Sequence, residues 1–201
     1  MAETIIDAYG DAGYSSATGW TQFTGQGINS DLEYRTSGSG TNKATWNFGA
    51  VTAGDYTVSV HWATHSNRAT DAPYTVYHKG VNTLPSVSNP IVAVADNTDE
   101  DGNVNADTTT IDVNQEQLND GTTGGSGDNS GYLDIGIYTS DGVTDFKVIL
   151  TDNANEFVIA DAVKINGPIV SSTRAVSSGR TVASGRGAAS SRTVVTSRTV
   201  V

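Results

Sequence analysis

Apolar residues in this chain recur in short alternating or β-branched runs, each followed by a turn signal, and not with the period of a helix. The clearest run, Tyr56-Thr-Val-Ser-Val-His-Trp62, places Tyr56, Val58, Val60 and Trp62 on one face of a strand. Gly is abundant (22 residues) and Pro is scarce (4), which favours many polar turns over long helices. Strands are expected at residues 4–6, 32–35, 44–48, 56–62, 74–77, 109–113, 132–138, 145–150 and 157–165.

The number and spacing of these strands predict an all-β fold, a β-sandwich of the jelly-roll-like type. A chain of 201 residues is long enough to bury one sizeable core. After Gly167-Pro168 the composition changes abruptly to Arg, Ser, Thr, Val, Gly and Ala. We therefore expect one sandwich domain over residues 1–168 and an extended C-terminal tail over residues 169–201.

The net charge of −11 is unevenly distributed along the chain. Residues 1–170 carry all 22 acidic residues and six of the 11 basic ones, whereas residues 171–201 carry five Arg and no acid. The acidic part should repel nucleic acid and anionic membranes, and five dispersed charges are a weak footprint for phosphates. Neither a nucleic acid nor a membrane is expected as a partner.

The chain contains no Cys, which excludes disulfides, thiolate zinc sites and a Cys nucleophile. The N-terminal sequence MAETIIDAYGD lacks the basic and apolar regions of a signal peptide, and no apolar run is long enough to span a membrane. We expect either that an export signal was removed or that the protein leaves its cell without one, as virion proteins do on lysis. The expected location is a virion or an extracellular surface.

The tail has a six-residue period. Arg recurs at every sixth position, and an apolar residue follows two places later. In a strand an even step keeps these residues on one face, whereas in a helix it scatters them, so the tail is expected to be extended and to bind other copies of the chain or other proteins of an assembly. The alternative is a flexible low-complexity linker. The residues assigned to assembly are Arg174, Arg180, Arg186, Arg192, Arg198, Val176, Val182, Val194 and Val200.

Several segments, in order, resemble the golvesin and xanthan lyase carbohydrate-binding-like domain over about residues 4–167. They are Ile5-Ile-Asp-Ala-Tyr-Gly-Asp-Ala-Gly-Tyr14, Gly19-Trp20, Ala44-Thr-Trp46, Val60-His-Trp62, Ser66-Asn-Arg-Ala-Thr-Asp-Ala-Pro-Tyr-Thr-Val-Tyr-His78, Ile111-Asp-Val-Asn-Gln115, Tyr132-Leu-Asp-Ile-Gly136, Val148-Ile-Leu-Thr-Asp152 and Val158-Ile-Ala-Asp-Ala-Val163. The resemblance implies a β-sandwich accessory domain of secreted or cell-surface proteins, for which sugar binding is inferred.

The chain departs from the family pattern in two regions. Residues 82–106 are an insertion, and the Gly-rich stretch 121–131 lengthens the next turn. Tyr132 stands where the family tends to have Trp, so a sugar platform built on that aromatic residue would be altered. Insertions of this kind lie on the surface and commonly carry function.

No catalytic signature is present, because the chain has no G-x-S-x-G, HExxH or P-loop sequence. The chain is therefore not expected to be an enzyme. His61 and His65 are four residues apart, which would align them on a helix, but here they follow a strand and enter a turn. We interpret these two and His78 as solvated loop residues.

The candidate carbohydrate-binding residues are Trp20, Asn67, Arg68, Tyr74 and Tyr132. Trp20 follows Thr18-Gly19 in a loop and is expected to be exposed, whereas Trp46 and Trp62 lie in phase with core residues. For Asn67 and Arg68 two roles remain open. Arg68 could pair with a buried carboxylate such as Asp161, or both residues could donate hydrogen bonds to a ligand.

Residues Asn97, Asp99, Asp101 and Asn103 match the first half of a D-x-D-x-D-G calcium loop. The twelfth position, normally Glu, is Thr108, so the match is partial. Calcium is the one cofactor considered, and a solvated acidic loop is the alternative.

Three functions follow from these observations. The first is a non-catalytic structural and adhesive surface protein, such as a virion decoration or fibre protein anchored through its tail. The second is a secreted carbohydrate-binding module. The third is an extracellular filament subunit assembled by strand addition.

Overall fold

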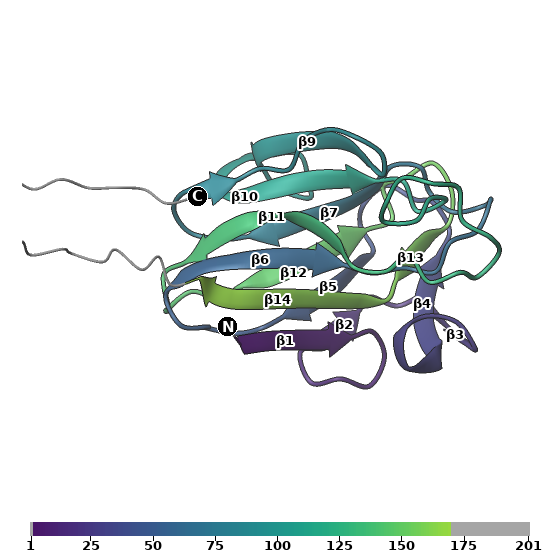
Figure 1. Ribbon diagram of the computed structural model, residues 1–201, viewed down its shortest axis with the longest axis horizontal. Helices are drawn as coiled ribbons and strands as arrows, with labels where there is room; N and C mark the ends of the chain where they lie inside the picture. Colours follow the sequence, from purple (N-terminus) through teal and green to yellow (C-terminus); the bar gives the residue numbers. More distant parts are fainter. Residues whose placement is uncertain (1, 170–201) are drawn as a thin grey trace, which may run out of the picture. The chain divides into compact units, whose positions relative to one another are not determined.

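The computed structural model describes residues 2–169, which form fourteen strands and one short 3-10 helix (Figure 1). No helix among these residues is long and apolar enough to cross a membrane. The expected all-β fold is confirmed. The elements are β1 (Ala2–Asp7), β2 (Tyr14–Ser16), β3 (Thr21–Thr24), η1 (Ile28–Ser30), β4 (Asp31–Arg35), β5 (Lys43–Asn47), β6 (Gly54–Val60), β7 (Ala72–Tyr77), β8 (Asn82–Thr83), β9 (Ile91–Thr98), β10 (Val104–Val113), β11 (Leu133–Ser140), β12 (Lys147–Thr151), β13 (Val158–Ala160) and β14 (Ala162–Ile169).

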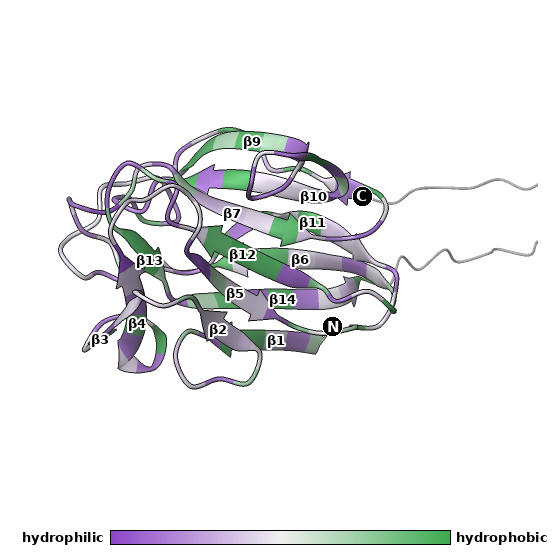
Figure 2. Ribbon diagram, turned by 180° about the vertical axis from the view of Figure 1, so that it is seen from behind, coloured by the Kyte–Doolittle hydropathy of each residue, from purple (hydrophilic) through white to green (hydrophobic). Residues whose placement is uncertain are grey.

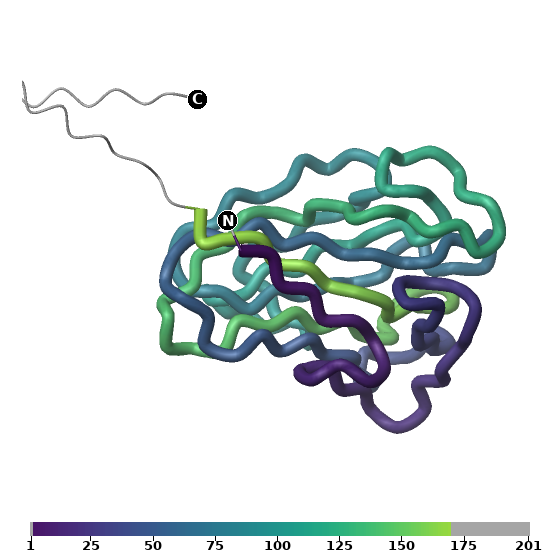
Figure 3. Tube along the Cα trace, turned by 60° about the horizontal axis from the view of Figure 1, so that its bottom comes forward, coloured from purple at the N-terminus to yellow at the C-terminus, as the bar shows by residue number. Residues whose placement is uncertain are grey.

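Two antiparallel sheets lie face to face as a sandwich (Figure 1). One has the order β1-β14-β6-β11-β8 and the other the order β2-β5-β12-β7-β10-β9. The first and last described strands are neighbours, because β1 pairs with β14 from Ala2 opposite Gly167 to Asp7 opposite Ala162 (Figure 3). A third sheet, β13-β4-β3, lies at one end of the sandwich.

The core lies between the two large sheets and is built from alternate residues of their strands (Figure 2). In β6, Tyr56, Val58 and Val60 are buried as their spacing predicts. Trp46 and Trp62 are fully buried in the same core, as expected for residues in phase with it. Burial of such large aromatic side chains contributes much of the hydrophobic free energy of folding.

The insertion at residues 82–106 contributes structure to both sheets. Its β8 extends the first sheet beside β11, and its β9 extends the second sheet beside β10. The insertion thus adds the outermost strand at one edge of each layer.

The run 157–165, expected to be one strand, is divided at Asp161. Before this residue β13 pairs with β4 in the small sheet, and after it β14 pairs with β1 and β6 in the large one. The backbone carbonyl of Asp161 accepts hydrogen bonds from Ala8 N (2.8 Å) and Trp46 Nε1 (3.2 Å). The break therefore occurs at a buried polar residue whose backbone bonds leave the sheet ladder.

Candidate functional site

The small sheet lies at one end of the sandwich (Figure 1), and the segment around Arg68 is joined to it through Phe157. Arg68 forms a parallel bridge with Phe157, the residue just before β13. Ala69 N donates to the carbonyl of Phe157 at 2.7 Å, and Phe157 N donates to the carbonyl of Asn67 at 3.4 Å. These backbone bonds fix the Asn67-Arg68 segment against the strand that carries Phe157.

A hollow of about 190 Å³ lies at this end, lined by Phe23, Tyr34, Asn67, Arg68 and Phe157, and is called here the Phe23 groove. Phe23 is 44% exposed although it is a large apolar residue. The rings of Tyr34 and Phe157 meet edge to face at a centroid distance of 5.9 Å. The groove thus combines aromatic surface with amide and guanidinium donors, the chemistry that sugar rings and hydroxyls require.

A second hollow, of about 250 Å³, shares two lining residues, Asn67 and Phe157, with the Phe23 groove. Its other lining residues are Thr36, Ser37 and Glu156, all of them polar. Together the two hollows offer an aromatic part and a hydroxyl-rich part. A ligand of more than one sugar unit could contact both.

Arg68 is not paired with a carboxylate in the described part of the chain, so of its two possible roles the ion pair with Asp161 is wrong. Asp161 is hydrogen-bonded instead to His61, with 2.8 Å between Oδ2 and Nδ1, and it accepts a bond from Ile28 N at 3.0 Å. Arg68 donates through Nη1 to Asn67 Oδ1 at 3.0 Å, while its buried Nε has no protein partner. Burial lowers the pKa of Arg68 below its ordinary value. Arg68 therefore lines the groove without a carboxylate partner, and its Nε is a buried donor without a protein acceptor.

Two comparisons agree with this fold. Residues 4–89 match the family described as the Golvesin C-terminal domain. The structure of Paenibacillus xanthan lyase is similar at 26% sequence identity and a TM-score of 0.57, covering 81% of this chain and 13% of that chain. The chain is thus similar to the Golvesin C-terminal domain over residues 4–89 and to a part of this xanthan lyase in fold. No curated protein matches the chain.

The resemblance inferred from the sequence segments is thereby confirmed. The Golvesin C-terminal domain is a non-catalytic kind of domain, although the structural neighbour is a lyase. The chain spans about 13% of the length of that lyase, so the activity of the whole lyase is not transferred to it.

Three residues expected to contact sugar, Trp20, Tyr74 and Tyr132, do not line the Phe23 groove. Trp20 is 9% exposed and packs in the core, which corrects the expectation of an exposed ring. Its loop folds back, since Trp20 N donates to Ala17 O at 3.4 Å. Tyr74 is 1% exposed, and its hydroxyl accepts a bond from Gln115 Nε2 at 3.0 Å, so it is a core residue.

Tyr132 is half-buried beside the long first sheet. Lys164 Nζ lies over its ring at 4.2 Å from the centroid, and the ring of His61 lies 5.4 Å away. One face of the Tyr132 ring is thus occupied by the ammonium group of Lys164. Of the five candidate residues, only Asn67 and Arg68 therefore line the aromatic groove.

Two histidines interpreted as solvated are buried, which corrects that interpretation. His61 is 2% exposed because it bonds to the buried Asp161, and His78 is 4% exposed against Tyr138. Burial lowers the pKa of His78. Within residues 2–169, no group of three or more His, Cys, Asp or Glu side chains is arranged to hold a metal ion.

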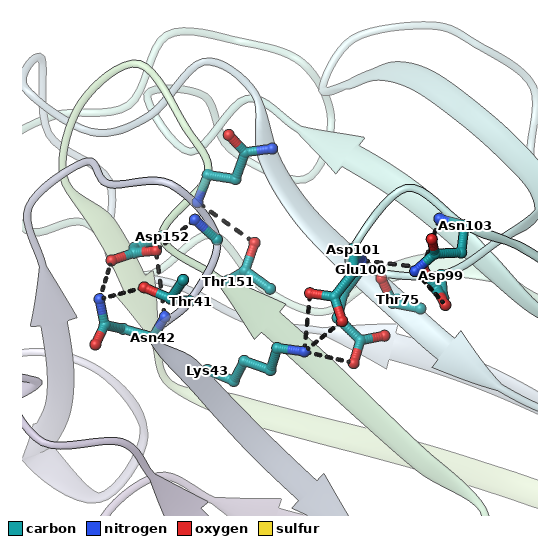
Figure 4. A network of polar contacts seen from close by, with 12 residues as sticks. Thr41, Asn42, Lys43, Thr75, Asp99, Glu100, Asp101, Asn103, Thr151 and Asp152 are labelled. Carbon is teal, nitrogen blue, oxygen red and sulfur yellow. Dashed lines mark hydrogen bonds and ion pairs between the residues drawn. The ribbon is translucent and has the colours of Figure 1, made fainter.

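The loop 97–103 is held by internal contacts (Figure 4). Asp99 Oδ1 accepts bonds from Asp101 N (3.0 Å) and Asn103 N (2.8 Å). Lys43 Nζ binds Glu100 at 3.0 Å and Asp101 at 3.1 Å, and thus supplies positive charge to this loop. The Asn97 amide turns to Asp96 Oδ2 at 3.2 Å. Calcium binding by Asn97, Asp99, Asp101 and Asn103 stays a prediction.

The tail residues from Arg174 to Val200 that are assigned to assembly lie outside the described residues. Their role also stays a prediction.

The sequence reasoning missed Phe23, Tyr34 and Phe157 as site residues. Each is an ordinary apolar or aromatic residue of a short β-run, and only the third sheet brings them together. The one available signal was Phe157, an aromatic residue that directly follows the turn 152–156 and precedes the apolar run 158–160.

Proposed function

We propose that this chain is a non-catalytic structural and adhesive surface protein whose golvesin-like sandwich binds glycan in the Phe23 groove. The observation that carries the proposal is the combination, in one hollow, of three aromatic side chains with the amide of Asn67 and the guanidinium of Arg68, which has no carboxylate partner among the described residues. Aromatic rings bury the apolar face of a pyranose, while amide and guanidinium groups donate to its hydroxyls.

The similarity to a domain of a xanthan lyase supports a polysaccharide as the ligand class, since that enzyme acts on one. The acidic character of residues 1–170 favours a neutral or weakly charged glycan over a polyanion, because like charges repel. Arg68 can still bind a single carboxylate or acetal oxygen in the groove.

The finer role that we propose is that of a virion decoration or fibre protein anchored through residues 169–201. It is supported by the six-residue Arg period, which a flexible linker has no physical reason to keep. The alternative is a secreted carbohydrate-binding module, and the Phe23 groove favours it equally, because it needs no assembly. The two differ in whether the full chain forms oligomers.

The groove is tested with the full chain on a glycan array, followed by calorimetric titration of the best ligand. Phe23→Ala should weaken binding at least about tenfold, equivalent to about 1.4 kcal/mol, without changing the melting temperature. The matched control is Tyr9→Asn, which removes another ring, 52% exposed, and keeps a residue tolerant of the positive φ of 62°. No glycan bound at millimolar concentration, or equal binding by the Phe23 variant, would refute the groove as a sugar site.

A further inference from the structure

A second polar site lies where the end of β1 meets the loop between β3 and β4. It contains the carboxylates of Asp7, Asp11, Asp31 and Asp161, called here the Asp7 cluster. Asp7 is only 4% exposed and Asp161 is fully buried. Asp7 N donates to Asp11 Oδ2 at 2.9 Å, and this bond joins the end of β1 to the turn that follows. Buried carboxylates are rare in proteins unless they are paired or bind a cation.

The carboxylate of Asp7 points toward the loop 25–31. Its Oδ2 accepts a hydrogen bond from Asn29 Nδ2 of this loop at 2.8 Å. Its Oδ1 is buried and has no protein partner, and Asp31 Oδ1 is also buried without one. Two carboxylate oxygens of the cluster therefore lack the hydrogen bonds that buried acceptors normally have.

The loop 25–31 packs closely on Asp161. Ile28 N donates to Asp161 Oδ1 at 3.0 Å. A Cβ atom on Gly27 would lie 2.2 Å from the carbonyl oxygen of Asp31 and 2.9 Å from Asp161 Oδ2. The backbone carbonyl of Asp31 and the carboxylate of Asp161 thus both lie close to Gly27.

The charges of the cluster are poorly balanced. In the part of the chain that the structure describes, no Lys or Arg forms an ion pair with any of its four carboxylates, and His61 is bonded to Asp161 alone. Burial first, and then the neighbouring Asp161, Asp31 and Asp11, raise the pKa of Asp7 to about 7, while Asn29 opposes this. A cation placed among these oxygens would remove both the repulsion and the unsatisfied acceptors.

We propose that the Asp7 cluster binds one calcium ion, with Asp7 and Asp31 as carboxylate ligands and the carbonyl groups of loop 25–31 completing the oxygen set. Calcium is the cation that suits this set, because it takes mixed carboxylate and carbonyl oxygens in irregular geometry, whereas Mg²⁺ demands a regular octahedron. Only two side chains are assigned as ligands, because no group of three or more His, Cys, Asp or Glu side chains within residues 2–169 is arranged to hold a metal ion. This site is separate from the loop 97–103 and does not depend on glycan binding.

The test uses the full chain freed of metal with chelator, then titrated with CaCl2 by calorimetry and heated with and without calcium. The wild type should bind calcium and its Tm should rise on addition of the ion. Asp7→Asn and Asp31→Asn should each weaken binding at least about tenfold, since each removes a charged ligand. Asp99→Asn is the matched control in the loop 97–103 and should keep both the affinity and the Tm shift.

Two ligand variants are used because one of them can fail to fold. Absence of calcium binding by the wild type at millimolar concentration would overturn the proposal. So would binding that survives in both Asp7→Asn and Asp31→Asn, or binding that is lost in Asp99→Asn alone, which would assign the ion to the other loop. Tighter binding of Mg²⁺ than of Ca²⁺ would overturn the identity of the cation.

Discussion

The carboxylate of Asp152, at the end of β12, lies 3.3 Å from Nε of Arg35, at the end of β4. Asp152 is almost fully buried and also accepts bonds from Asn42 Nδ2 (2.6 Å) and Gly40 N (2.8 Å) (Figure 4). Although burial alone would raise it, these hydrogen bonds lower the pKa of Asp152. One side chain thus ties the loop 38–42 and the small sheet to the core.

Asp152→Ala should therefore reduce the free energy of unfolding at pH 7 by about 2–4 kcal/mol, because it leaves buried donors without an acceptor. Urea denaturation measures this difference. Asp145→Ala, which removes an exposed carboxylate near the start of the same strand, is the control and should change stability by less than about 0.5 kcal/mol. Equal losses of unfolding free energy in the two variants would show that the buried contacts of Asp152 add no more stability than an exposed carboxylate does.

Arg68→Ala should reduce the free energy of unfolding by only about 1 kcal/mol, because Arg68 has no carboxylate partner to leave unpaired. The same change should weaken glycan binding. A loss of more than about 3 kcal/mol on denaturation would instead indicate that Arg68 locks its segment to the sandwich.

Titration of Asp112 should lower the free energy of unfolding as the pH rises from about 4 to about 6. Burial, and then the charge of Asp71, raise the pKa of Asp112 to about 6. Since the folded state then holds the proton more tightly than the unfolded state, the free energy of unfolding decreases as pH rises through this window. Asp112→Asn should be about 1 kcal/mol more stable than the wild type at pH 7 and equal to it near pH 4. Denaturation curves at both values decide this, and a pH-independent difference would contradict it.

Gly27→Ala should destabilise the protein by more than about 2 kcal/mol, because its φ of 83° is strained for Ala and the new Cβ would lie 2.2 Å from Asp31 O. Gly25→Ala in the same loop is the control. Its φ is 93° and its Cβ would meet nothing within 4 Å, so it adds strain alone, about 1 kcal/mol. Similar melting temperatures for the two variants would mean that close packing at Gly27 is unimportant.

Removal of residues 171–201 should leave a folded monomer that no longer joins its assembly, if the tail serves attachment. The cut follows Val170 because β14 runs to Ile169, one residue beyond the boundary expected from the sequence. Analytical ultracentrifugation of the full and shortened chains makes the comparison. The same oligomers in both would favour the linker interpretation of the tail.

Much of the fold could be predicted because the core strands alternate clearly, as β6 and β5 do. The strand β9 was missed because it contains Asp96 and Asn97 and lies at a sheet edge, where only one side is paired. The break at Asp161 was hidden in a continuous apolar run. The Asp7 cluster was missed because its members are far apart in the sequence. Its one signal was that Asp7 and Asp161 each stand within or directly after apolar runs.

The order of β14 between β1 and β6 has a mechanical consequence. The chain leaves β14 at the end of the sandwich opposite the small sheet that carries the Phe23 groove (Figure 1). Tension between a glycan held in the groove and an anchor beyond Ile169 would run along β14. Such a load shears the hydrogen bonds to both neighbours together, so they resist in parallel instead of opening one after another. The topology suits a domain that must resist mechanical unfolding under tension along β14.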